Sequence, residues 1–90
     1  MKQCLTAIFD SVRNRFEYVE VYCTRAEAKR SFQERCNDRS HLFFRYPDDF
    51  ELFMLGTLDD SSGELRTFDK PMRLDTARGS RDPGRFSRVS

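Results

Sequence analysis

Alternating ring-bearing and aliphatic side chains mark the clearest element of this chain, residues 16–23, FEYVEVYC. Successive side chains of a strand point to opposite faces of its sheet, so this alternation predicts a strand. Regular alternation would place Phe16, Tyr18 and Tyr22 on one face, together with Glu20. Residues 3–9, QCLTAIF, also favour a strand, and a polar turn separates the two segments. We therefore expect an antiparallel hairpin.

A helix is predicted directly after this hairpin. Thr24 and Glu27 have the spacing of a capping box, in which a hydroxyl and a carboxylate bind free backbone N–H groups of the first turn. An apolar residue then recurs at every fourth position, which gives one narrow stripe on a charged helix. The stripe consists of Ala28, Phe32 and Cys36. Asn37-Asp38 is expected to end the helix.

Residues 50–58, FELFMLGTL, predict a strand that is apolar on both faces. Such a strand is typical of the centre of a covered sheet, or of the seam of a dimer. A buried helix is the alternative, and Gly56 counts against it. Residues 59–63, DDSSG, have the composition of a hairpin turn, residues 64–68 predict a returning strand, and Pro71 is expected to close the ordered region.

The predicted order is strand, strand, helix, strand, strand, which is an α+β domain with a small antiparallel sheet and one main helix over residues 1–72. The whole chain has 90 residues. A domain of this size buries little more than about 60% of its unfolded surface, so we expect a homodimer to bury more. Residues 73–90 carry five arginines and two aspartates among glycine, serine and proline, which predicts a flexible basic tail.

Composition argues against several classes of protein. No apolar run reaches the roughly 18 residues of a membrane helix, and charges follow the N-terminus too early for a signal peptide. We therefore expect a cytosolic protein without a membrane partner. Three widely spaced cysteines and a single histidine lack the spacing of a zinc site, so we expect buried thiols, no metal and no cofactor.

Catalysis also lacks candidates in this sequence. A nucleophile needs a base held by a third group, and His41 in a polar loop offers no such set. The acidic pairs Asp48-Asp49 and Asp59-Asp60 are either turn residues or Mg²⁺ ligands, and their neighbours Pro47 and Gly63 favour turns. We expect that the protein is not an enzyme.

Binding of single-stranded nucleic acid is the function that the residues favour. Such proteins combine a basic groove with aromatic rings on which bases stack. The predicted platform is Phe16, Tyr18 and Tyr22. The basic candidates are Arg13, Arg15, Arg25, Lys29 and Arg45, with Arg78, Arg81 and Arg85 in the tail. The alternatives are that the rings are the inner face of the sheet, packed on Phe32, and that the tail is only a solubilising end.

The apolar residues of 50–55 are given a different role. Carboxylates flank them on both sides, from Asp48 to Asp60, and would repel phosphate. We therefore expect these residues in the core or in a dimer interface. For Phe43 and Phe44, which precede Arg45, the sequence leaves both roles possible: an internal position, or exposed rings beside a phosphate contact.

Several short motifs occur in a recognisable order: Arg30-Ser31-Phe32, Asn37-Asp38, Tyr46 to Leu52, Leu55 to Gly63 and Asp69-Lys70-Pro71. Residues 1–72 thereby resemble the small non-structural protein of gokushovirus-type microviruses, which are single-stranded DNA phages. The resemblance implies a DNA-binding phage protein that is absent from the virion, lies in the host cytoplasm, and acts when genome synthesis changes to single strands for packaging. The alternative function is a dimeric interaction factor that binds a phage replication or capsid protein and no DNA.

Overall fold

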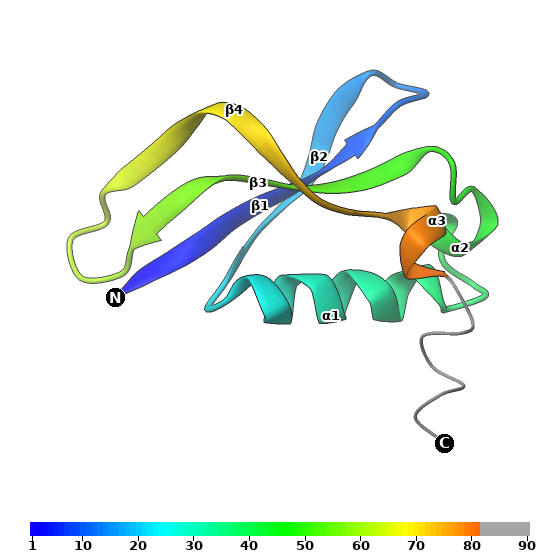
Figure 1. Ribbon diagram of the computed structural model, residues 1–90, viewed down its shortest axis with the longest axis horizontal. Coiled ribbons are helices and arrows are strands. Elements are labelled where there is room, and N and C mark those ends of the chain that lie inside the picture. Colours follow the sequence, from blue (N-terminus) through cyan, green and yellow to red (C-terminus); the bar gives the residue numbers. More distant parts are fainter. Residues whose placement is uncertain (82–90) are drawn as a thin grey trace.

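A single four-stranded antiparallel sheet with helices on one side forms the fold, and it confirms the predicted α+β class. The computed structural model describes residues 1–81. The elements are β1 (Lys2–Asp10), β2 (Arg15–Tyr22), α1 (Arg25–Cys36), α2 (Leu42–Arg45), β3 (Phe50–Asp59), β4 (Leu65–Thr76) and α3 (Ala77–Ser80). The strand order is β2-β1-β3-β4, with β1 and β3 in the centre. Figure 1 shows α1, α2 and α3 on the same side of the sheet.

Strand β3 settles the choice between strand and helix for residues 50–58. It pairs with both β1 and β4, and its buried positions alternate with half-buried ones. Within one chain only one face of β3 is therefore fully covered, and the alternative of a dimer seam on the other face stays a prediction. Gly56 is required here because a Cβ at this position would collide with the carbonyl oxygen of Arg66 on β4.

Helix α1 begins and packs as its sequence predicts. The Thr24 hydroxyl accepts the backbone N–H of Glu27 at 3.1 Å, which satisfies one free donor of the first turn. The apolar stripe of Ala28, Phe32 and Cys36 is buried against the sheet. At the other end the Asn37 amide donates to the carbonyl of Ser80 at 3.0 Å, so α1 is tied to α3.

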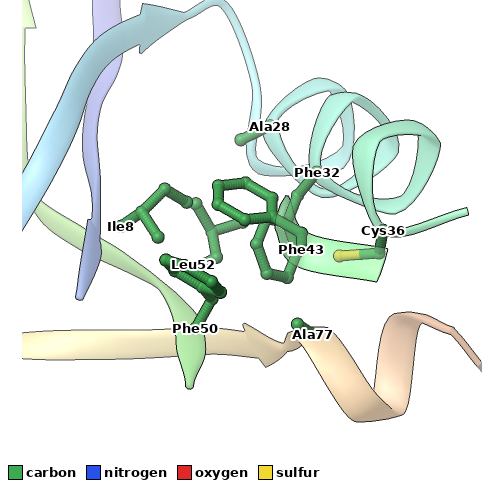
Figure 2. Packing of buried hydrophobic residues seen from close by; sticks show 8 residues of the cluster. All are labelled: Ile8, Ala28, Phe32, Cys36, Phe43, Phe50, Leu52 and Ala77. Carbon is green, nitrogen blue, oxygen red and sulfur yellow. The ribbon is translucent and has the colours of Figure 1, made fainter. Parts of the chain in front are cut away.

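The core lies between the sheet and the helices, and Phe43 is at its centre (Figure 2). The ring of Phe43 is fully buried and lies 4.7 Å from the ring of Phe50 and 5.5 Å from that of Phe32, measured between centroids. Ile8 and Leu52 complete the sheet side of the cluster. Phe43 is thus a core residue, which resolves its role.

The ordered domain continues beyond residue 72. Pro71 lies inside β4, which runs to Thr76, and α3 follows directly. Residues 73–81 are therefore part of the fold, which differs from the prediction of a flexible tail beginning at residue 73. A strand at the edge of a sheet tolerates proline because one row of its N–H groups has no partner to lose. The remainder of the predicted tail, residues 82–90, lies outside the described residues.

The acidic pair at the β3–β4 turn has the structural role that its neighbours indicate. One carboxylate oxygen of Asp59 accepts the backbone N–H groups of Ser61 and Ser62. The Asp60 carboxylate binds the N-terminal ammonium group at 2.9 Å. These hydrogen bonds lower the pKa of both carboxyls, so both are charged at neutral pH.

His41 gives this fold a predicted dependence on pH. Its Nδ1 accepts the backbone N–H of Phe43 at 3.2 Å, and burial together with the nearby Arg35 lowers the pKa of the imidazole. Because the unfolded chain binds this proton more tightly, stability is complete above pH 6.5 and is lost as pH falls towards the lower pKa of the folded state. His41→Asn keeps a capping acceptor but removes the titration. We expect urea midpoints to fall between pH 7 and pH 5 in the wild type and to fall less in the variant; equal declines would exclude His41 as the source.

None of the helices among residues 1–81 is both long enough and apolar enough to cross a bilayer.

Candidate nucleic-acid interface

The sheet face opposite the helices, which we call the open face, carries a cluster of three phenylalanine rings. Ile8 and Leu52 point into the core, so their neighbours Phe9 and Phe53 point to the open face. Phe16 lies directly across from Phe9 on the next strand. The ring centroids of Phe16 lie 5.0 Å from Phe9 and 5.5 Å from Phe53, and Phe9 lies 6.4 Å from Phe53. These three residues are the ring cluster.

Apolar surface continues from the ring cluster along β2. Val21 pairs with Leu5 on the same face, and Val19 is 63% exposed. Phe16 itself is 40% exposed, although burying a phenylalanine side chain would stabilise the fold. Contiguous exposed apolar surface of this kind is typical of a binding site.

Three exposed arginines lie near the ring cluster in the strand register, each beside a carboxylate, but only Arg73 is on its face. Glu17 pairs with Ile8, which points into the core, so the ion pairs of Glu17 lie on the helix side of the sheet. Arg13 and Arg15 both bind the Glu17 carboxylate, at 3.2 and 2.7 Å. Arg73 lies opposite Phe53 on β4 and binds Glu51 at 3.0 Å. These arginines are strongly exposed, and such surface pairs are weak enough for a phosphate to compete with the carboxylate.

The predicted platform is divided between the two faces of the sheet, which corrects the prediction that its three rings share one. Thr6 pairs with Glu20 and Ile8 with Glu17, so Tyr18 and Val19 together oppose Ala7 in a β-bulge. Tyr18 has a φ of 54°, in the left-handed region that few residues other than glycine adopt. The extra residue reverses the alternation, so Phe16 lies on the open face while Tyr18 and Tyr22 lie on the helix side.

Both tyrosines make contacts within the fold. The Tyr18 ring, 42% exposed, meets the Phe43 ring edge-on at 5.6 Å. The Tyr22 hydroxyl is within 3.0 Å of both Glu20 and Ser31, and Tyr22 packs against the core. Arg35 closes this network through its ion pair with Glu20 at 2.8 Å. Tyr22 thus serves to join β2 to α1.

The other basic candidates lie away from the ring cluster. Arg25 and Lys29 are on α1 and Arg45 ends α2, all in the helical layer. Arg78 forms an ion pair with Asp48, which lowers the pKa of that carboxyl. Arg81 lies 4.1 Å from the Phe44 ring and donates to the Phe44 carbonyl. Arg85 lies outside the described residues.

Sequence reasoning missed Phe9 and Arg73 as members of this site. Phe53, which was predicted in a core or dimer interface because carboxylates flank its segment, lies on the open face, and its role in a dimer interface stays a prediction. Three of those carboxylates have local partners: Glu51 binds Arg73, Asp48 binds Arg78, and Asp60 binds the N-terminus. The sequence signal that could have identified the ring cluster was the pair Phe9 and Phe16, because a short hairpin turn places these two residues side by side.

Two features of residues 1–81 concern metal binding and thiol reactivity. Within residues 1–81, no group of three histidine, cysteine or acidic side chains is close enough to hold a metal ion. Burial raises the pKa of the Cys36 thiol to about 12, and it also raises the pKa of Cys4. Neither of these two thiols is therefore suited to act as a nucleophile at neutral pH. Cys23 is exposed, which corrects the expectation that the thiols are buried.

Comparison with protein families gives one match, described as Phage ORF5 protein, over residues 3–79. The matched range runs from β1 into α3 and so covers the whole sheet. Comparisons with curated proteins and with solved structures give no match.

Proposed function

The chain belongs to the Phage ORF5 protein family, and from that premise we propose that it is a non-structural phage protein that binds single-stranded DNA. It acts in the host cytoplasm during genome replication or packaging, as in the gokushovirus type, and is neither an enzyme nor part of the virion. One observation carries the proposal: three mutually contacting rings lie on an open sheet face, with the exposed Arg73 beside them.

The chemistry of the open face fits an unpaired strand better than a duplex. Unpaired bases expose their flat surfaces, and each base stacked on an aromatic side chain contributes about 1–3 kcal/mol. In duplex DNA those surfaces are covered by neighbouring bases. Arg73 lies beside the rings and would then exchange the Glu51 carboxylate for a phosphate. Arg13 and Arg15 lie at the β1–β2 end of the sheet and would do the same for a strand that continues past the turn.

Binding of a labelled oligothymidylate tests the proposal. We expect micromolar or tighter binding at low salt, and much weaker binding of a duplex of the same length. If Arg13, Arg15 and Arg73 each contact a phosphate, the logarithm of the affinity should fall against the logarithm of salt with a slope of roughly −2. Undetectable binding at low salt, or equal affinity for the duplex, would reject the proposed function.

A second candidate is a dimeric interaction factor that binds a phage replication or capsid protein. It is favoured by Val19 and Val21, whose aliphatic side chains continue the open face and offer no stacking surface. On this alternative, Val19→Asp with Val21→Asp would abolish self-association in sedimentation experiments. A wild type that sediments as a monomer would count against the dimer.

A further inference from the structure

A hollow of about 290 Å³ lies at the end of the sheet that carries Arg13. It lies between the β1–β2 turn and the loop that leads into β3. Its lining consists of Asp10, Val12, Arg13, Tyr46, Asp49 and Phe50. Ligand pockets commonly measure about 300–1,000 Å³, so this hollow suits one nucleobase rather than a large cofactor.

Hydrogen bonds hold the walls of the hollow in place. Ser11 donates to the Asp49 carbonyl oxygen through both its N–H, at 2.9 Å, and its hydroxyl, at 3.2 Å. The buried Asp10 carboxylate accepts the N–H groups of Val12 and Arg13 at 3.0 and 3.2 Å. The N–H of Asp49 donates to the carbonyl of Tyr46 at 3.1 Å. The hollow is therefore formed before any ligand arrives.

The lining combines apolar walls with one carboxylate, that of Asp49, which no side chain or backbone group of residues 1–81 binds. Val12, Tyr46 and Phe50 supply flat or aliphatic surface, and Tyr46 is largely exposed. Among residues 1–81 the half-buried Asp49 carboxylate has neither a hydrogen-bond donor nor an ion-pair partner. Its oxygens are open to water, so a ligand that brings N–H donors would replace that hydration with direct hydrogen bonds.

The hollow lies one residue beyond the ring cluster along the strands, at the end of the sheet. Asp10 follows Phe9 in β1 and pairs with the core residue Phe50, so this part of the lining belongs to the helix side. Arg13 lines the hollow from the β1–β2 turn and binds Glu17 in β2. A strand that crosses the open face would reach the hollow by passing the β1–β2 turn.

We propose that the hollow takes one base of the bound strand and that Asp49 selects guanine; this rests on the proposed single-stranded DNA binding. Guanine presents two adjacent donors on its pairing edge, N1–H and the N2 amino group, which match the two oxygens of a carboxylate. Cytosine and adenine each present an amino donor beside an acceptor nitrogen. Thymine presents one N–H between two carbonyl oxygens, which a carboxylate repels. Tyr46 supplies a ring against which the base stacks.

Oligonucleotides that differ at one position test the selection. Replacing one central thymine of an oligothymidylate with guanine should raise wild-type affinity about tenfold, towards the low end of the discrimination expected for a bidentate contact. Hypoxanthine, which lacks the N2 amino group, should lose most of that gain. Asp49→Asn should remove the preference without weakening oligothymidylate binding, because it also removes the charge that repels thymine. Asp69→Asn, a matched loss of one carboxylate elsewhere on the chain, should retain it.

The outcomes separate this inference from the proposed function. Oligothymidylate binding without a guanine preference, or a preference that survives Asp49→Asn, overturns the guanine site and leaves DNA binding intact. Guanosine monophosphate should also shift the backbone amide resonances of Ser11, Val12 and Asp49 more than thymidine monophosphate does. If an arginine amide shifts them instead, the hollow accepts a basic side chain of a protein partner and the inference fails.

Discussion

Replacing Phe43 with alanine is expected to lower the free energy of unfolding by about 3–5 kcal/mol, the usual range for deleting a buried aromatic ring. Phe43 contacts the rings of Phe32, Phe50, His41 and Tyr18, and its own surface is fully buried. The four-residue helix α2 that carries it has few internal hydrogen bonds and is held mainly by this ring. Because small domains have a total stability of only about 5–15 kcal/mol, much of the variant should unfold at moderate temperature.

Phe44→Ala is the matched control for this prediction. Phe44 is the next residue in α2 and is half-buried, and its contact with the Arg81 guanidinium lies at the surface. Urea unfolding followed by circular dichroism should therefore show a loss below about 2 kcal/mol for Phe44→Ala, in the range of ordinary surface and partly buried substitutions. Equal losses in the two variants would contradict the assignment of Phe43 as the centre of the core.

Elements with a strong period could be predicted from the sequence. The stripe of Ala28, Phe32 and Cys36 identified α1 because a helix places every fourth residue on the same face. The turn chemistry of Asp59 and Asp60 identified the β3–β4 hairpin because short acidic side chains satisfy free N–H groups locally. These signals depend on neighbours within a few residues, which a sequence displays directly.

The sequence could not show that the rings of Phe16, Tyr18 and Tyr22 are divided between the two faces of the sheet. The bulge that places Tyr18 at positive φ has no glycine or asparagine to mark it. It brings the Tyr18 ring against Phe43, which lies 25 positions away in the sequence. A single extra residue reverses every later position of a strand, so the strand was predicted correctly and its faces were not.

The assignment of residues 50–55 to internal positions was confirmed for one face of β3. Phe50, Leu52 and Met54 are buried, whereas Phe53 lies on the open face. Glu51, which indicated repulsion of phosphate there, is bound by Arg73 from the segment predicted as a tail. The sequence did not show this pairing because Pro71 indicated the end of the fold rather than a position within an edge strand. A dimer interface on this face stays a prediction.

The ring cluster offers the sharpest test between the two candidate functions. Phe16→Leu combined with Phe53→Leu keeps apolar bulk on the open face but removes two flat rings. If bases stack on these rings, single-stranded DNA binding should weaken by about 2–6 kcal/mol, at the usual contribution for each stacked base. The same substitutions should leave self-association or binding of a protein partner nearly unchanged, because leucine preserves most of the apolar surface.

Tyr18→Leu is the control for this double variant, since it removes an equally exposed ring from the helix side of the same strand. We expect it to bind oligothymidylate as the wild type does, once circular dichroism has established that all three proteins are folded. Fluorescence anisotropy with a labelled oligonucleotide measures each affinity. If Tyr18→Leu weakens binding while the double variant does not, the strand binds on the helix side of the sheet and the ring cluster serves a protein partner.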